Sequence, residues 1–154
     1  MPPRYQEGLE RNARLRIEGA RNLVGAARAA NVKRMVAQSI AFIYAPGAGA
    51  RVESDPLNGD RAVARTVEGV KALEESVLAL PEGIVLRYGY LYGPGTWFEA
   101  PAKPPSLYID AAAQATVLAL ARGRHGLYNI AEDDGAVSSE KAKRELGFAA
   151  GFRL

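Results

Sequence analysis

The side chains that most often hold metals or act as nucleophiles are scarce in this sequence. It has no cysteine and a single histidine, His125, so disulfides, thiolate metal sites and cysteine nucleophiles are excluded, and zinc would have to rely on one imidazole plus carboxylates. The acidic turn Glu132-Asp133-Asp134 has too few further oxygen ligands near it in the sequence to indicate a calcium site. No G-x-S-x-G motif makes His125 part of a serine triad. We therefore predict no metal site and interpret His125 as an exposed turn residue.

Helical and strand-like segments alternate along the chain, and these segments must position any functional site. In order, we expect a helix over about 7–30, a strand over 34–40, a helix over 60–79, a strand over 83–88, a helix over 109–121, a strand over 127–130 and a helix from Ser138 or Ser139 to Leu146. The strands are nearly continuous in apolar residues, which is typical of strands covered on both faces. The alternation predicts an α/β fold with a parallel sheet and helices on both of its faces.

Two loops interrupt this alternation. Residues 45–59 are dense in turn formers, and residues 89–106 contain four of the nine prolines, so we predict no regular structure in either. Asn31 stands where a helix end tolerates a left-handed residue. Because binding and catalytic residues are often carried by loops, residues 89–106 are a natural place to look for a site.

Length and composition indicate an ordinary globular domain. The 154 residues are 48% hydrophobic, and 20 basic against 17 acidic side chains give a net charge of +3. No apolar run is long enough to cross a bilayer and the N-terminus lacks a secretory signal, so we expect a cytoplasmic protein without a membrane partner. The basic excess lies in residues 1–34, where Arg14, Arg21 and Arg28 share one side of a helix. We interpret it as a solvated face and not as a nucleic-acid surface.

Four stretches together resemble successive segments of one family. They are ARNLVGAARAANVKRMVAQSIAFIYAPG, VLRYGYLYGPGTWF, YIDAAAQATVLAL and GLYNIAEDDGAVSSEKAKRELGF, and they follow the order of the NAD-dependent epimerase/dehydratase family, the extended short-chain dehydrogenases. The resemblance implies a Rossmann-like fold, NAD or NADP as cofactor, and a small hydroxylated or nucleotide-sugar substrate. It divides a single partial domain, residues 1–154, into a remnant of the nucleotide-binding part (1–88) and a remnant of the substrate-binding part (89–154).

The sequence departs from the family where the cofactor's pyrophosphate would bind. The family opens with a strand and a G-x-x-G-x-x-G turn, whose backbone N–H groups and helix N-terminus hold the pyrophosphate. This sequence has no such turn and begins in what resembles the family's fourth helix. We therefore expect three early strands to be missing, and NAD or NADP binding to be weak or absent.

A second departure concerns the Tyr-x-x-x-Lys pair, in which the family's phenol transfers a proton and the lysine holds the ribose. Lys71 matches the lysine, but Val67 stands in the place of the tyrosine. The register from Tyr44 places Ile40 at the family's hydroxyl position, with Ser39 beside it. Lys71 and Ser39 are the candidate catalytic residues that the resemblance implies. Each has a structural alternative: Lys71 as a solvated helix lysine, and Ser39 as a strand-end hydroxyl bonded to the backbone.

The loop after residue 87 carries the predicted cofactor contacts. Tyr88, Tyr92, Gly93 and Pro94 match the family segment that passes the nicotinamide end of the pocket. The alternative is a simple turn beside a strand. The family then has several dozen residues that cover the substrate, whereas only about a dozen separate Gly95 from Tyr108. The sequence therefore predicts that this lid is deleted.

Two hypotheses for function remain open. The first is an NAD(P)-dependent epimerase/dehydratase-like oxidoreductase, truncated and impaired in cofactor binding and catalysis. The second is a catalytically silent module for interaction or oligomerisation that derives from the same fold. The right-handed crossover through the helix at 60–79 places the strands at 34–40 and 83–88 side by side. An unpaired edge on the strand at 34–40 favours a homo-oligomer, since apolar strands with open edges tend to pair with other chains.

Overall fold

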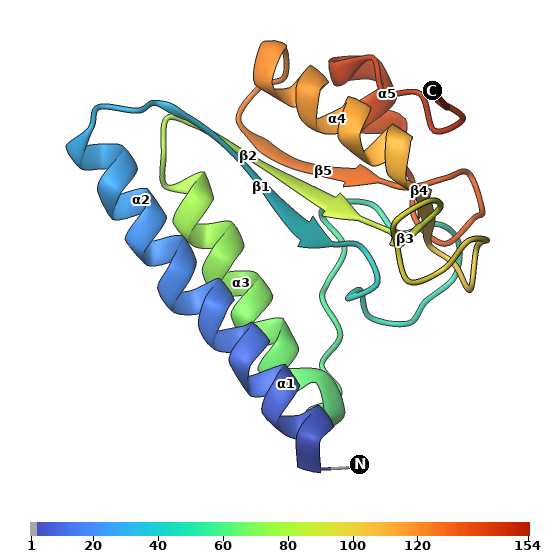
Figure 1. Cartoon of the computed structure of the whole chain (residues 1–154), viewed down its shortest axis with the longest axis horizontal. Helices are drawn as coiled ribbons and strands as arrows, with labels where there is room; N and C mark the ends of the chain where they lie inside the picture. Colours follow the sequence, from blue (N-terminus) through green and yellow to red (C-terminus); the bar gives the residue numbers. More distant parts are fainter. Residues whose placement is uncertain (1–2) are drawn as a thin grey trace.

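A three-stranded parallel sheet forms the centre of the molecule, for which a computed structural model describes residues 3–154. Its order is β1 (Arg34–Ile40), β2 (Glu82–Tyr88) and β5 (Gly126–Ile130). Figure 1 shows α4 and α5 above the sheet and α1 to α3 below it. The predicted α/β class, the parallel pairing of the first two strands and the helices on both faces are thus confirmed.

One long helical segment and α3 (Ala64–Leu78) cover the lower face. The segment consists of α1 (Pro3–Arg14), a π-helical turn (Leu15–Gly19) and α2 (Ala20–Ala29), and the left-handed residue that follows, Asn31, has φ 55°. Its buried side chains are small: Ala13, Ala20, Val24 and Ala27. A side chain at Gly69 of α3 would come within 3.0 Å of the Ala13 Cα. Small residues therefore let the two helices lie close together.

A short 3₁₀ turn (Arg61–Val63) opens the crossover from β1 to β2. Asp60 caps this turn, because its carboxylate accepts a hydrogen bond from the Ala62 N–H at 2.8 Å. In α3, Val67, Val70 and Val77 turn inward and are buried. The helix predicted over 60–79 is therefore confirmed, with its first residues in 3₁₀ form.

The upper face is covered by α4 (Ile109–Ala121) and α5 (Glu140–Leu146). Arg34 of β1 donates to the carbonyls of Ala119 and Arg122 at 3.0 and 2.6 Å, so it caps the carboxyl end of α4. Ser139 stands at the N-cap of α5 as expected, yet its hydroxyl donates to the Ala131 carbonyl at 3.0 Å. The position of the cap was predicted correctly. The Ser139 hydroxyl, however, does not bond the first turn of α5 but links the helix to the residue after β5.

The prediction that residues 89–106 have no regular structure is wrong in part. Tyr90–Tyr92 forms β3, which pairs in parallel with β4 (Ser106–Tyr108). The prolines of the loop lie outside the paired residues, and the Pro105 carbonyl accepts from the Tyr90 N–H at 2.7 Å. Proline density therefore did not prevent a short ladder. Among the described residues, no helix is both long and apolar enough to cross a membrane.

Candidate active site

A row of polar side chains crosses the sheet near the carboxyl ends of its strands. Ser39, Arg87 and Asn129 are register neighbours on β1, β2 and β5, and all three are buried. In open parallel sheets this end is where ligands bind. The row therefore lies where the fold places a site.

Glu74 of α3 joins two members of this row. Its Oε1 accepts from the Ser39 hydroxyl and from the Arg87 Nε, both at 2.8 Å, and its Oε2 accepts from the Arg87 Nη2 at 2.6 Å. The side chains of the ion pair are 4% and 7% exposed, so the pair is almost fully removed from water. Ser39 thus has a carboxylate partner, whereas its structural alternative gave it a backbone partner.

Tyr44 extends the network toward β5. Its hydroxyl accepts from the Arg87 Nη1 and donates to the Asn129 Oδ1, both at 2.7 Å. Burial raises the pKa of Tyr44, and the Arg87 charge opposes this only in part. Burial alone would lower the pKa of Arg87, but its hydrogen bonds and its attraction to Glu74 outweigh burial and raise that pKa. The Arg87 side chain therefore stays charged, and the Tyr44 phenol stays neutral.

The two residues that the resemblance assigned to the family's hydroxyl and phenol positions are apolar and lie in the same cluster. Ile40 and Val67 belong to one buried cluster with Ile43 and Val70. Lys71 follows on the same helix, and it is exposed. Within residues 3–154, no hydrogen bond or ion pair holds its ammonium. The structure thus brings Ser39 into the polar network and leaves Lys71 outside it.

The predicted cofactor residues lie on β2, β3 and the turn after them. The Tyr88 hydroxyl is buried against α4, where it donates to the Ala112 carbonyl at 2.8 Å and bonds Thr116. The Tyr92 hydroxyl donates to Glu132 at 2.6 Å. Gly93 has φ 110°, and a side chain there would come within 2.7 Å of the Tyr108 ring. Pro94 is exposed. Both phenols are thus engaged inside the protein, and a cofactor role for these residues stays a prediction.

The other acidic and basic candidates each have a hydrogen-bond partner within the protein. His125 is exposed, and its Nε2 donates to the Leu78 carbonyl at 2.8 Å. In the acidic turn, Glu132 bonds Tyr92 and Arg153, and Asp133 bonds Lys143. The Ser106 hydroxyl lies between the other two carboxylates, at 3.3 Å from Glu132 and 2.9 Å from Asp134. Two of the three carboxylates therefore converge on Ser106, whereas Asp133 binds Lys143 instead.

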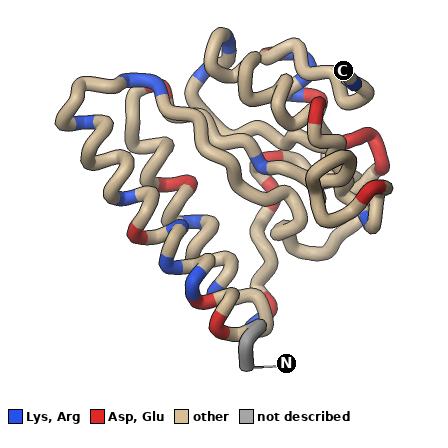
Figure 2. The backbone as a smooth tube through the Cα atoms, in the orientation of Figure 1, with Lys and Arg blue, Asp and Glu red and all other residues tan. Residues whose placement is uncertain are grey.

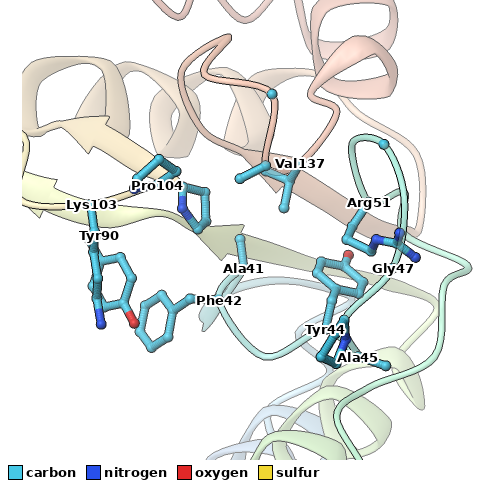
Figure 3. A pocket seen from close by; sticks show the side chains of 15 residues that line it. Ala41, Phe42, Tyr44, Ala45, Gly47, Arg51, Tyr90, Lys103, Pro104 and Val137 are labelled. Atoms are coloured by element: carbon cyan, nitrogen blue, oxygen red, sulfur yellow. The ribbon is translucent and has the colours of Figure 1, made fainter.

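Two clefts open beside the ends of the strands, and part of the lining of each comes from residues 89–106, where the sequence analysis looked for a site. The first, which we call the Arg51 cleft, has a volume of about 500 Å³ (Figure 3). It is lined chiefly by Ala41, Phe42, Tyr44, Gly47, Arg51, Tyr90, Lys103, Pro104 and Val137. The second, the Trp97 cleft, measures about 410 Å³ and is lined by Ile40, Phe42, Leu91, Trp97, Phe98 and Ile109 among others. Residues far apart in sequence form both clefts. The proline-rich loop at 89–106 and the short spacing after Gly95 indicated this region, but no pattern indicated Arg51.

Charge elsewhere on the surface is mixed. Figure 2 shows Lys and Arg interspersed with Asp and Glu along α1 and α3, whereas α2 carries basic residues alone. Glu10 and Glu68 both bond Arg65, at 2.9 and 2.6 Å. Such pairing is typical of a solvated helical face.

No family model matches the chain. Among curated proteins, a 3-diazoavenalumate denitrifying reductase from a Streptomyces species is 37% identical over 158 aligned positions, which cover 87% of this chain and 52% of the relative. The chain thus spans about half the length of that relative.

Solved structures resemble the chain more broadly. The UDP-glucose 4-epimerase of Thermotoga maritima with UDP-glucose has a TM-score of 0.77 at 16% identity, over 95% of this chain and 67% of its own. The dTDP-glucose 4,6-dehydratase of Bacillus anthracis with NAD has 0.72 at 16%, over 91% and 64%. The UDP-glucuronic acid 4-epimerase of Bacillus cereus with NAD has 0.70 at 16%, over 90% and 63%. The chain therefore has the fold of the NAD-dependent epimerases and dehydratases, which confirms the predicted resemblance.

Proposed function

We propose that this chain belongs to an NAD(P)-dependent reductase of the epimerase/dehydratase type that reduces an electron-poor acceptor without a proton-transfer residue. The observation that supports the proposal is the buried aliphatic cluster that contains Ile40 and Val67. These are the residues that the resemblance assigns to the family's hydroxyl and phenol positions. Epimerases and dehydratases of alcohols must move a proton from a substrate hydroxyl. A site built around two aliphatic side chains cannot do so, but it can exclude water around a reaction that needs no proton.

The diazo reductase relative supports this class of reaction. Reduction of an aryl diazonium forms a C–H bond from a hydride and breaks the C–N bond, and the electron pair of that bond leaves with dinitrogen. No proton enters or leaves, so the reaction balances without an acid or a base from the protein. At 37% identity the relative is also far more similar in sequence to this chain than the epimerases are.

The residues present fit only one end of the dinucleotide. The ammonium of Lys71 is exposed and has no partner among the described residues, so it is free to bind a ribose hydroxyl. Nothing in the sequence supplies the glycine turn for the pyrophosphate. The bound reduced nicotinamide would supply the hydride. The chain's own contribution would be to hold the ribose with Lys71 and to exclude water from the acceptor.

Deuterium transfer tests the proposal directly. The purified chain is mixed with an aryl diazonium carboxylate and NADH or NADPH deuterated at the hydride position, and deuterium in the arene is measured by mass spectrometry. We expect transfer faster than in a protein-free reaction. Lys71→Ala should slow it, whereas Lys33→Ala, which changes another exposed lysine, should not. A rate equal to the protein-free rate with both coenzymes would overturn the reductase function and favour the silent module.

A further inference from the structure

The Arg51 cleft has an unusual balance of charge for its size. Among the described residues that line it, Arg51 and Lys103 are the charged ones, and both are cationic. The rest of the lining is aromatic, aliphatic, glycine or proline. A volume of about 500 Å³ lies within the range of small-molecule sites, which are mostly apolar with a few polar groups that fix orientation. The cleft therefore suits a small anion with an apolar body.

One wall of the cleft is a stack of three side chains. The rings of Phe42 and Tyr90 are parallel, with centroids 3.9 Å apart, and the Lys103 Nζ lies 4.4 Å from the Tyr90 centroid. Since both neighbours cannot occupy the same face of Tyr90, the ring is held between them. Lys103 is thus committed to Tyr90 on the side away from Phe42. The outer end of the stack is the Phe42 ring, which is 38% exposed.

The facing wall presents Arg51. Its backbone is fixed by hydrogen bonds with Ala136 and Ser138, at 3.0 and 2.8 Å. Its side chain is held more loosely, by the Ala48 carbonyl at 2.7 Å and by Asp55 at 3.8 Å. Figure 3 shows the guanidinium beside Gly47, with the Phe42 and Tyr90 rings across the cleft. A Cβ at Gly47 would lie 2.3 Å from the Arg51 Nη2, so this glycine makes room for the guanidinium.

We propose that the Arg51 cleft binds a planar aromatic carboxylate, with the carboxylate on Arg51 and the ring on the Phe42 side. The inference deepens the proposed function and rests on it for the link to substrate, because it names the class of acceptor. A guanidinium binds a carboxylate through paired N–H donors, and an aromatic ring is favoured beside Phe42. Lys103 lies on Tyr90, whereas the pair of Arg51 with Asp55 is long at 3.8 Å, so Arg51 is the cation that a ligand carboxylate can engage. That argues for a single negative charge and against the diphosphate of a nucleotide sugar.

Binding of 4-hydroxycinnamate to the full chain, without coenzyme, tests the inference by calorimetric titration. We expect this acid to bind, and its neutral amide and UDP-glucose to bind at least tenfold more weakly. Arg51→Gln should weaken binding about tenfold or more, since a hydrogen bond to a charged group is lost. Arg61→Gln is the matched control, because Arg61 is exposed and does not line the cleft.

Two further variants keep the inference falsifiable. Gly47→Ala leaves the charge in place but displaces the flexible end of Arg51, so it should weaken binding as Arg51→Gln does while the chain stays folded. Phe42→Leu should weaken binding severalfold, whereas Phe98→Leu, which changes the lining of the Trp97 cleft alone, should not. Equal binding of acid and amide, or tighter binding of UDP-glucose, would overturn the inference. Because no coenzyme is present, a lack of turnover in the deuterium assay leaves this result intact.

Discussion

Removing the Glu74 carboxylate should destabilise the protein more than removing one partner of a surface ion pair does. Glu74 and Arg87 approach to 2.6 Å with side chains 7% and 4% exposed. At an effective dielectric constant of about 20, their attraction at this distance is about 6 kcal/mol, and desolvation cancels part of it. Glu74→Ala leaves the guanidinium buried and unpaired and also removes the acceptor of the Ser39 hydroxyl. We expect a loss of about 3–5 kcal/mol in the free energy of unfolding.

Urea unfolding followed by circular dichroism measures this loss. With a slope near 2 kcal/mol per molar, the midpoint should fall by about 2 M. Glu68→Ala is the matched control, because Glu68 lies on the same helix and pairs with Arg65 at 2.6 Å while 61% exposed; it should cost about 0–1 kcal/mol. The double variant Glu74→Leu/Arg87→Met should regain most of the loss. If Glu74→Ala costs no more than Glu68→Ala, the reasoning about the buried pair is wrong.

Four further outcomes are expected. Burial raises the pKa of Tyr44, so its contribution to stability is complete below about pH 10 and is lost as pH rises through the folded pKa; the urea midpoint should fall in that range, and less steeply in Tyr44→Phe. Calorimetry of this chain should show that NAD and NADP bind with dissociation constants above the micromolar range. A micromolar dissociation constant would refute the inference that these residues supply no pyrophosphate site. Val67→Tyr should restore no turnover of nucleotide sugars, and product detected by chromatography would contradict this. Light scattering should detect a dimer through the edge of β1, whereas a stable monomer at tens of micromolar would count against it.

Helices and strands were predictable wherever one residue pattern decided the outcome. The helix at 109–121 was placed with the bounds that the structure gives, because its alanine-rich run ends at Arg122-Gly123 and Gly123 takes φ 83°. The pair of β3 and β4 was missed, since it depends on two loop segments meeting across more than a dozen residues. Local patterns carry no information about such a meeting.

The candidate site was predictable only where the family resemblance reached it. Ser39 was located at the end of its strand, but its partner Glu74 sits on α3 and was not anticipated, because one acidic residue inside an amphipathic helix has no special pattern. Arg51 and Lys103 were missed for a different reason. They meet in one cleft only after the loops at 41–51 and 103–105 fold over the ends of β1 and β3.

Two kinds of side chain lie along one face of α3, a buried charged group and a run of valines. In α3, Glu74 keeps the Arg87 guanidinium buried and so fixes the row of polar groups across the sheet, whereas one and two turns earlier Val70 and Val67 face an aliphatic cluster. The charged pair cannot be removed one partner at a time without a large cost, but a phenol at the surface of a pocket can be replaced by valine with little effect on folding. The fold therefore does not depend on a phenol at position 67. The proposed hydride transfer, which needs no proton from the protein, is compatible with such an arrangement.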